Sequence, residues 1–102
     1  MTYEQEISIF EELTAYMRAT FAEKRHDYGA TTTETYEKFG PVSMLVRMHD
    51  KIGRLDNLLV NNITNRVVDE KIEDTLFDLA NYALIMILEM HKHQLKEQTE
   101  AI

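Results

Sequence analysis

Hydrophobic residues recur along most of the chain at intervals of three or four, the spacing that places them on one face of an α-helix. This pattern predicts three long helices, with approximate bounds 3–25, 41–61 and 68–90. A threonine-rich stretch between the first two predicts one short helical turn over residues 34–39. Gly29 and the Gly40-Pro41 pair separate these segments, as glycine and proline commonly do at helix ends. We therefore expect an all-α fold, a helical bundle of three long helices plus one short helix.

The third long helix, over residues 68–90, carries an apolar face and an acidic side. At about 100° per residue, one broad face collects Ile72, Leu76, Leu79, Ala83, Met86, Ile87 and Met90. The opposite side collects Glu70, Asp74, Asp78 and Asn81, each roughly one turn from the next.

The second half of this helix is apolar nearly all round, because Ile85 and Leu88 lie on the same side as the acids. A helix that is apolar on every side is buried, so we expect the acidic side to enter an interior or an interface. Carboxylates at the edge of a dry region need a cation, either a basic side chain or a metal ion. From these residues alone, a functional acid cluster and a solvated acidic stripe both remain open interpretations.

The second long helix, over residues 41–61, also carries two rows. Its apolar face consists of Leu45, Met48, Ile52, Leu55 and Leu59. A basic row at the same spacing consists of Arg47, Lys51 and Arg54, with Asp50 beside it. This row is either a solvated charged face or a row that faces the acids of the last helix or binds phosphate.

Length and composition indicate one compact domain over residues 1–102, with a polar tail at 91–102. The chain has no cysteine, which excludes disulfides and thiolate metal sites and fits a cytoplasmic location. Residues 1–10 include Glu4 and Glu6, so we expect no signal peptide there. The longest apolar stretch, 79–90, is shorter than the roughly twenty residues that span a bilayer, so we expect no membrane partner.

The net charge of −7 disfavours nucleic acid as the main partner, since a nucleic-acid binder needs a basic face. Acidic residues do suit a site for metal-bound phosphates, where carboxylates hold the cation. The chain has no glycine-rich phosphate loop after a strand, and neither Ser8 nor Ser43 lies in a nucleophile elbow. An acidic row facing a basic row suggests metal-assisted attack of water on a nucleotide phosphoanhydride.

Four motifs follow one another in an order that resembles a known family. They are Lys24-x-x-Asp27-Tyr28-Gly29, Gly40-Pro41, Arg47-x-x-Asp50-Lys51-x-x-Arg54-Leu55 and Glu73-Asp74-x-x-x-Asp78-Leu79-x-Asn81-Tyr82-Ala83. Over roughly residues 20–90 the chain resembles the nucleotide modification associated domain 1 family. These are small phage and bacterial proteins, placed with MazG-like and dimeric dUTPase-like enzymes in the all-α nucleoside triphosphate pyrophosphohydrolase superfamily.

The resemblance implies a helical bundle that forms dimers or tetramers and uses Mg²⁺, or Mn²⁺ in its place. It implies a cytoplasmic location, in the host cell if the chain is encoded by a phage. The implied reaction converts a nucleoside triphosphate into a monophosphate and pyrophosphate, with modified or non-standard deoxynucleotides among the candidate substrates.

The resemblance also implies roles for individual residues. Its metal ligands are Asp74, Asp78, Glu70 and Asp50, and its catalytic residues are Asp74, Asp78 and Glu73. Its substrate-binding residues are Lys24, Asp27, Tyr28, Arg47, Lys51, Arg54, Asn81 and Tyr82. Among these, Lys24, Lys51 and Arg54 are expected to hold phosphates, and Asn81 and Tyr82 to lie near the sugar or base.

The match departs from the superfamily pattern in the last helix. The superfamily usually has a glutamate three residues before the aspartate, whereas here Thr75 occupies that position and Asp74 lies four residues before Asp78. Two further functions therefore stay open. The chain could bind or sequester a nucleotide or nucleotide signal without hydrolysing it, or it could be a structural helical oligomer whose Lys51 and Arg54 pair with Asp74 and Asp78.

Overall fold

The computed structural model describes residues 1–61 and 71–100, with side-chain surroundings for residues 1–61 and 71–94. Its helices are α1 (Tyr3–Tyr28), α2 (Thr31–Phe39), α3 (Val42–Leu55), the π-helical turn η1 (Asp56–Val60) and α4 (Ile72–Glu100). The described residues contain no strand, which confirms the all-α prediction of three long helices and one short one. The chain forms two compact units, Met1–Thr32 and Thr33–Ile102.

Helix α1 forms most of the first unit and is capped at both ends. The hydroxyl of Thr2 accepts a hydrogen bond from the backbone N–H of Gln5, whose side chain accepts one from the N–H of Thr2. This capping box satisfies two N–H groups that have no partner within the helix. Gly29 ends the helix with φ of +59°, a conformation that favours glycine, and its N–H bonds to the carbonyl of Arg25.

The link between α2 and α3 is a tight corner at Gly40 and Pro41. Gly40 has φ of +76° and donates its N–H to the carbonyl of Tyr36. This hydrogen bond closes the last turn of α2. Pro41 directly precedes α3, where its missing N–H leaves no helical hydrogen bond unmade. The Ser43 hydroxyl donates to the carbonyl of Gly40 and ties the new helix to the corner.

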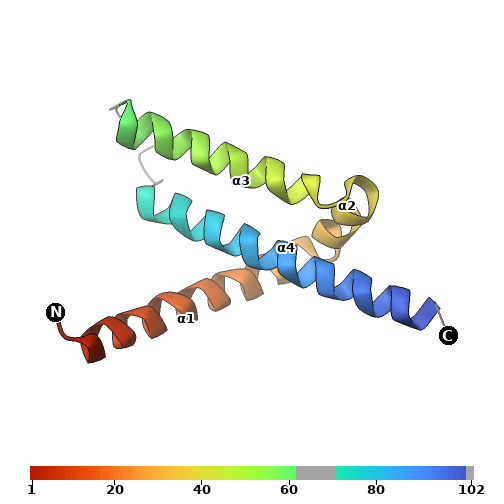
Figure 1. Cartoon of the computed structure of the whole chain (residues 1–102), viewed down its shortest axis with the longest axis horizontal. Helices are drawn as coiled ribbons and strands as arrows, with labels where there is room; N and C mark the ends of the chain where they lie inside the picture. The colour runs from red at the N-terminus through yellow and green to blue at the C-terminus, as the bar shows by residue number, and fades with distance from the viewer. Residues whose placement is uncertain (62–70, 101–102) are drawn as a thin grey trace. The chain divides into compact units, whose positions relative to one another are not determined.

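Helices α3 and α4 run side by side in opposite directions in the second unit (Figure 1). Side chains of α3 meet side chains of α4 along the seam between them, and the Arg54–Thr75 hydrogen bond lies near the start of α4. Among the described residues of this unit, the buried ones come from α2, α3 and α4; they are Tyr36, Met44, Thr75, Asn81 and Glu89.

The helix bounds differ from the sequence prediction at several ends. Helix α1 continues to Tyr28, α2 begins at Thr31, and the second long helix changes from α to π hydrogen bonding at Asp56. The expected start of the last helix at residues 68–70 lies outside the described residues. In the described part α4 begins at Ile72, and the Asp74 carboxylate accepts the backbone N–H of Lys71 just before it.

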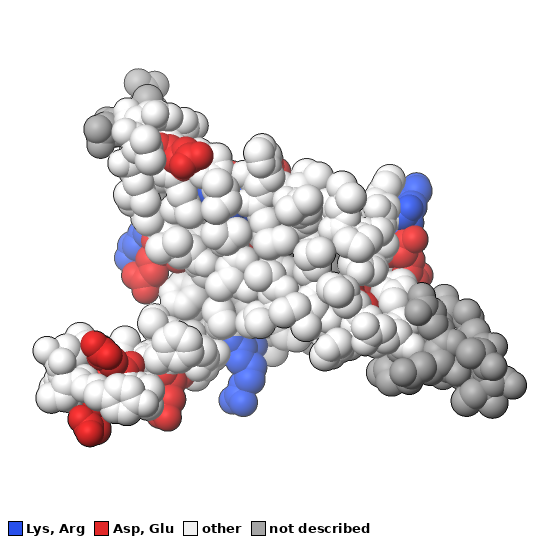
Figure 2. Space-filling view, in the orientation of Figure 1, with Lys and Arg blue, Asp and Glu red and all other residues white. Residues whose placement is uncertain are grey.

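The apolar face predicted for the last helix packs only in part in this chain, because Ile72, Leu79 and Met86 are part-buried while its other members are exposed. Leu76, Ile87 and Met90 are 48%, 50% and 42% exposed, whereas Thr75 and Glu89 are buried. The expectation of a helix buried on every side is therefore wrong for the single chain. The reason is that α3 packs against the polar side of α4, and the opposite helix surface faces out. Over α3 and α4, the surface in Figure 2 shows few charged side chains.

No helix in the described part of the chain combines the length and apolarity that crossing a membrane requires.

Candidate functional site

The seam between α3 and α4 is built from three polar rungs. The ammonium of Lys51 lies 3.1 Å from the Oδ2 atom of Asp78. One turn along, Nε of Arg54 donates to the Thr75 hydroxyl at 3.1 Å. One turn the other way, the guanidinium of Arg47 lies over the ring of Tyr82, 5.8 Å from its centroid. We call these three pairs the α3–α4 seam.

The spacing of the helix explains why these rungs form. Arg47, Lys51 and Arg54 are three or four residues apart and so lie on one face of α3. Because α4 runs in the opposite direction, the partners on α4 occur in reverse sequence order. Arg47 meets Tyr82, Lys51 meets Asp78, and Arg54 meets Thr75. The basic row predicted from the sequence therefore lines the seam with α4, where Lys51 and Arg54 are part-buried and Arg47 stays exposed.

The central rung is partly withdrawn from water. The side chains of Lys51 and Asp78 are 23% and 25% exposed. At this depth each charge needs the other, because a charge left alone in a drier environment loses much of its solvation. The pair still has access to solvent, so an incoming charged ligand can reach both groups.

Asn81 lies three residues beyond Asp78 and is 8% exposed. Its side-chain nitrogen is buried and has no hydrogen-bond partner within the described structure. A buried donor without an acceptor costs about 1–3 kcal/mol. An acceptor oxygen of a bound molecule or of water would satisfy it. This unpartnered amide supports the sequence-based expectation that Asn81 contacts a ligand.

The other acids proposed as ligands lie in different surroundings. Asp74 is half-buried and accepts the N–H of Lys71 at 3.1 Å, so it also caps α4. Glu73 on α4 and Asp50 on α3 are exposed, and Glu70 lies outside the described residues.

Asp74 and Asp78 could together hold one divalent cation. They lie one helical turn apart on α4, a spacing at which two carboxylates can meet at one ion. Among the described residues, no group of three or more acidic or histidine side chains is placed to hold a metal. Two carboxylates nonetheless fit Mg²⁺, which proteins usually hold with one or two carboxylates while substrate phosphates and water complete its shell.

Lys24, Asp27 and Tyr28 lie on the last turns of α1, in the first unit, and all three are exposed. The Asp27 carboxylate lies 3.3 Å from Nδ1 of His26. Tyr28 directly precedes the glycine that ends the helix. The role of these three residues in binding a substrate stays a prediction.

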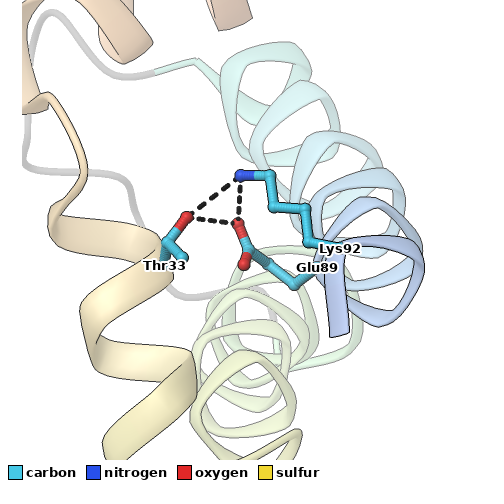
Figure 3. Close-up of polar contacts among 3 residues, drawn as sticks. All are labelled: Thr33, Glu89 and Lys92. Atoms are coloured by element: carbon cyan, nitrogen blue, oxygen red, sulfur yellow. Dashed lines mark hydrogen bonds and ion pairs between the residues drawn. The ribbon is translucent and has the colours of Figure 1, made fainter. Parts of the chain in front are cut away.

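A second polar cluster, which the sequence did not predict, joins α2 to α4 (Figure 3). Oε1 of Glu89 accepts hydrogen bonds from the Thr33 hydroxyl at 2.9 Å and the Lys92 ammonium at 2.8 Å. The Lys92 ammonium also donates to the Thr33 hydroxyl at 3.0 Å, which closes a triangle. Glu89 is 1% exposed, so this carboxylate depends on its two partners. The available signal was the single acid within an otherwise apolar stretch of the last helix.

The same cluster extends to an aromatic contact one turn further along α4. The ring of His93 lies 4.8 Å from the ring of Tyr36, centroid to centroid, at an angle of 37°. Oε2 of Glu89 and Nε2 of His93 are buried and have no partner in the described structure. Tyr36 comes from α2, so this contact also holds α2 against α4.

Comparison with known protein families identifies a match. The family model of the nucleotide modification associated domain 1 matches residues 24–90, about two thirds of the chain, and this range includes every residue of the α3–α4 seam. Searches of curated proteins and of solved structures give no match. The extent of the family match and the all-α fold agree with the four motifs read from the sequence. This chain belongs to the nucleotide modification associated domain 1 family.

Proposed function

We propose that the α3–α4 seam binds the phosphates of a nucleotide and hydrolyses a nucleoside triphosphate to a monophosphate and pyrophosphate with Mg²⁺. The observation that carries this proposal is the Lys51–Asp78 pair, a cation and a carboxylate held together in a partly exposed seam. Arg54 and Arg47 flank the pair on the same helix face. Membership of a family named for nucleotide modification supports a nucleotide as the ligand.

The basic residues bind the phosphates. On nucleotide binding, Lys51 leaves the Asp78 carboxylate and binds a phosphate oxygen. The phosphate oxygen is a comparable acceptor, and the phosphate chain carries more negative charge than the carboxylate. Arg54 presents a planar guanidinium, whose several N–H groups match phosphate oxygens. Arg47 keeps its contact with Tyr82 and adds positive charge at the other end of the seam. Phosphate binding then depends on three basic side chains that the fold already places in one row.

The acidic residues hold the metal. Once Lys51 turns to phosphate, the Asp78 carboxylate can accept another cation, and Asp74 lies one turn away. Bound Mg²⁺ supplies charge neutralisation and polarises the phosphoanhydride toward attack by water. In the proposed reaction water adds to the α-phosphorus and gives up a proton to solvent, the bond between the α-phosphorus and the α,β-bridging oxygen breaks, and pyrophosphate leaves with that oxygen. Asn81 and Tyr82 then contact the sugar or base.

An assay of pyrophosphate release tests this activity. The purified chain is incubated with Mg²⁺ and a panel of standard and modified deoxynucleoside triphosphates. We expect equal amounts of monophosphate and pyrophosphate from at least one substrate, and Asp78→Asn to lower kcat on the order of 100-fold. Glu37→Gln, which changes an exposed acid on α2, is the matched control and should keep the activity. Absence of pyrophosphate from every nucleotide would refute the hydrolase.

A second candidate function, nucleotide binding without turnover, is favoured by the same ion pair. Lys51 occupies the Asp78 carboxylate, and no third acidic or histidine ligand joins Asp74 and Asp78 in the described chain. A binding protein of this kind would still bind the nucleotide when a chelator has removed the metal, and it would release the nucleotide chemically unchanged. Calorimetry in chelator, followed by ³¹P spectra of the recovered nucleotide, distinguishes it from the hydrolase. Metal-dependent binding with conversion to monophosphate would exclude it.

The proposal includes two features of the wider superfamily. We propose that the chain belongs with the MazG-like all-α pyrophosphohydrolases, and that it associates with itself as a dimer or tetramer. The all-α fold is compatible with the first feature. The few large apolar side chains that α3 and α4 bury by themselves support the second.

A further inference from the structure

Helix α4 carries an exposed apolar stripe on the side away from the seam. It consists of Leu76, Ala83, Ile87 and Met90, and the three large members are 42–50% exposed. Leu84 beside the stripe is 51% exposed. These include residues that the sequence pattern placed on a core-facing surface. A stripe that repeats over four turns, with no charged member, differs from the scattered apolar residues of an ordinary surface.

Helix α3 and the turn that follows it carry a matching stripe. Leu45, Ile52 and Leu59 are 56%, 45% and 56% exposed. At 100° per residue, the stripe lies roughly 120–140° further round than the seam residues on α4 and, for Leu45 and Ile52, on α3, whereas Leu59 lies beyond α3 in the π-helical turn η1. Because the helices are antiparallel, equal rotations from the seam end on the same side of the pair. The two stripes therefore form one apolar face on the pair of helices.

The α4 stripe is self-complementary about Ala83. In an antiparallel contact between two copies of this helix, Ala83 meets itself and Leu76 meets Met90. The intervening positions pair Leu79 with Ile87. The small Ala83 at the centre lets the helix axes approach closely, while large side chains fill the flanks. From Leu76 to Met90 the contact extends about 21 Å.

Charge and area also favour a second copy. Each chain has a net charge of −7, so two copies repel, and a contact between them is least opposed where neither surface carries charge. The apolar face meets that condition. A stable interface buries about 800 Å² of accessible surface on each partner. A face made of two helices offers more surface for burial than one helical stripe. Within the second unit, only Tyr36 and Met44 are buried apolar residues among those described, so much of its apolar surface still lacks a partner.

We propose that two copies of this chain pair through the apolar face of α3 and α4, with the two-fold axis beside Ala83. The inference rests on the self-association part of the proposed function and assigns it a surface. The seam residues lie roughly 120–140° round each helix from this contact. Loss of the pairing and loss of nucleotide binding can therefore be measured separately.

Disulfide trapping tests the position of the axis. The chain has no cysteine, so Ala83→Cys introduces its only thiol. Two thiols can bridge only where the Cα atoms approach within about 7 Å, which a two-fold axis at this position allows. We expect mild oxidation to link most chains into dimers. Val46→Cys, at a 53% exposed position on α3 away from the face, is the matched control and should remain largely unlinked.

Three outcomes would overturn the proposal. In the first, Ala83→Cys links no faster than Val46→Cys. In the second, light scattering shows a monomer at all concentrations tested. In the third, the chain is a monomer and the new thiol is protected from a thiol reagent, which would mean that the chain covers this face itself.

Charge insertion provides a second test that keeps the seam intact. We expect Ile87→Glu to raise the dimer dissociation constant at least about 100-fold, because it places two carboxylates in an apolar contact. Val46→Glu should leave the dissociation constant unchanged. Circular dichroism establishes that each variant remains helical, and nucleotide binding is measured on the same samples. A helical Ile87→Glu variant that dimerises as tightly as the native chain would contradict the proposed face.

Discussion

The ammonium of Lys51 on α3 and the carboxylate of Asp78 on α4 form an ion pair of 3.1 Å in the α3–α4 seam. Each side chain is about a quarter exposed, so the pair is sheltered and still reachable by a ligand. The pair connects fold and proposed function. It joins the two helices in the free chain, and it brings together the cation that would hold phosphate and the acid that would hold metal.

The first prediction concerns the stability of this pair. Asp78→Asn leaves Lys51 in the seam without its countercharge, and we expect the free energy of unfolding to fall by about 1–3 kcal/mol. Denaturant unfolding of Asp78→Asn, Lys51→Met and the double variant measures the coupling energy between the two positions. The double variant should lose less than the sum of the two single changes. Strictly additive losses would show that the two side chains do not interact in solution.

The second prediction concerns Arg54. The variant Arg54→Gln removes the positive charge and keeps a polar side chain that can still donate a hydrogen bond. We expect nucleotide affinity to fall about 10-fold, as one charge-assisted contact to phosphate is lost. Lys38→Gln, on the exposed surface of α2, is the matched control with the same change in net charge. Equal losses in both variants would indicate only a general charge effect.

The third prediction concerns the unpartnered amide of Asn81. Asn81→Leu removes a buried donor that has no acceptor in the described structure, in exchange for an apolar side chain of similar shape. We expect the stability of the nucleotide-free chain to stay equal or to rise, while nucleotide affinity falls about 10-fold. Thermal unfolding and calorimetry on one preparation measure the two effects. A large loss of stability would mean that the amide has a structural partner in solution.

The fourth prediction concerns the cluster of Thr33, Glu89 and Lys92. Lys92→Met leaves the buried Glu89 carboxylate without its countercharge, and we expect a loss of about 3 kcal/mol in unfolding free energy. Adding Glu89→Leu should recover much of that loss, because an apolar side chain is well tolerated in a buried position. A matched change at an exposed lysine, Lys38→Met, should have little effect. Chemical denaturation of these variants provides the comparison.

The helical architecture could be predicted from the sequence because it depends on local signals. Gly29, Gly40 and Pro41 mark helix ends through backbone conformation alone, and the structure places helix boundaries at those residues. The basic row and the acidic side were also predictable, since helical spacing puts their members on common faces. Their meeting in the seam was one of two interpretations, and the Lys51–Asp78 pair supports it.

The packing of α4 could not be predicted from periodicity. A hydrophobic pattern identifies an apolar stripe such as Leu76 and Ile87 but does not say which partner covers it. In this chain α3 takes the polar side, where Lys51 and Arg54 find acceptors in Asp78 and Thr75. A stripe that is left for another copy has the same sequence pattern as a stripe that faces the chain's own core.

The α2–α4 cluster escaped prediction for a different reason. Thr33 and Glu89 are 56 residues apart, and their hydrogen bond depends on how two helices meet in space. A glutamate in a helix is commonly exposed, so its burial becomes evident only with the fold. The Lys92 side chain three residues further along also fits an ordinary surface pair within a helix.

The most direct test of the nucleotide site is a crystal structure with Mg²⁺ and a non-hydrolysable deoxynucleoside triphosphate. We expect phosphate oxygens at Lys51 and Arg54, an ion at the Asp78 carboxylate, and the Lys51–Asp78 contact opened from its 3.1 Å separation in the nucleotide-free chain. A structure with nucleotide bound elsewhere and the Lys51–Asp78 pair intact would contradict this expectation.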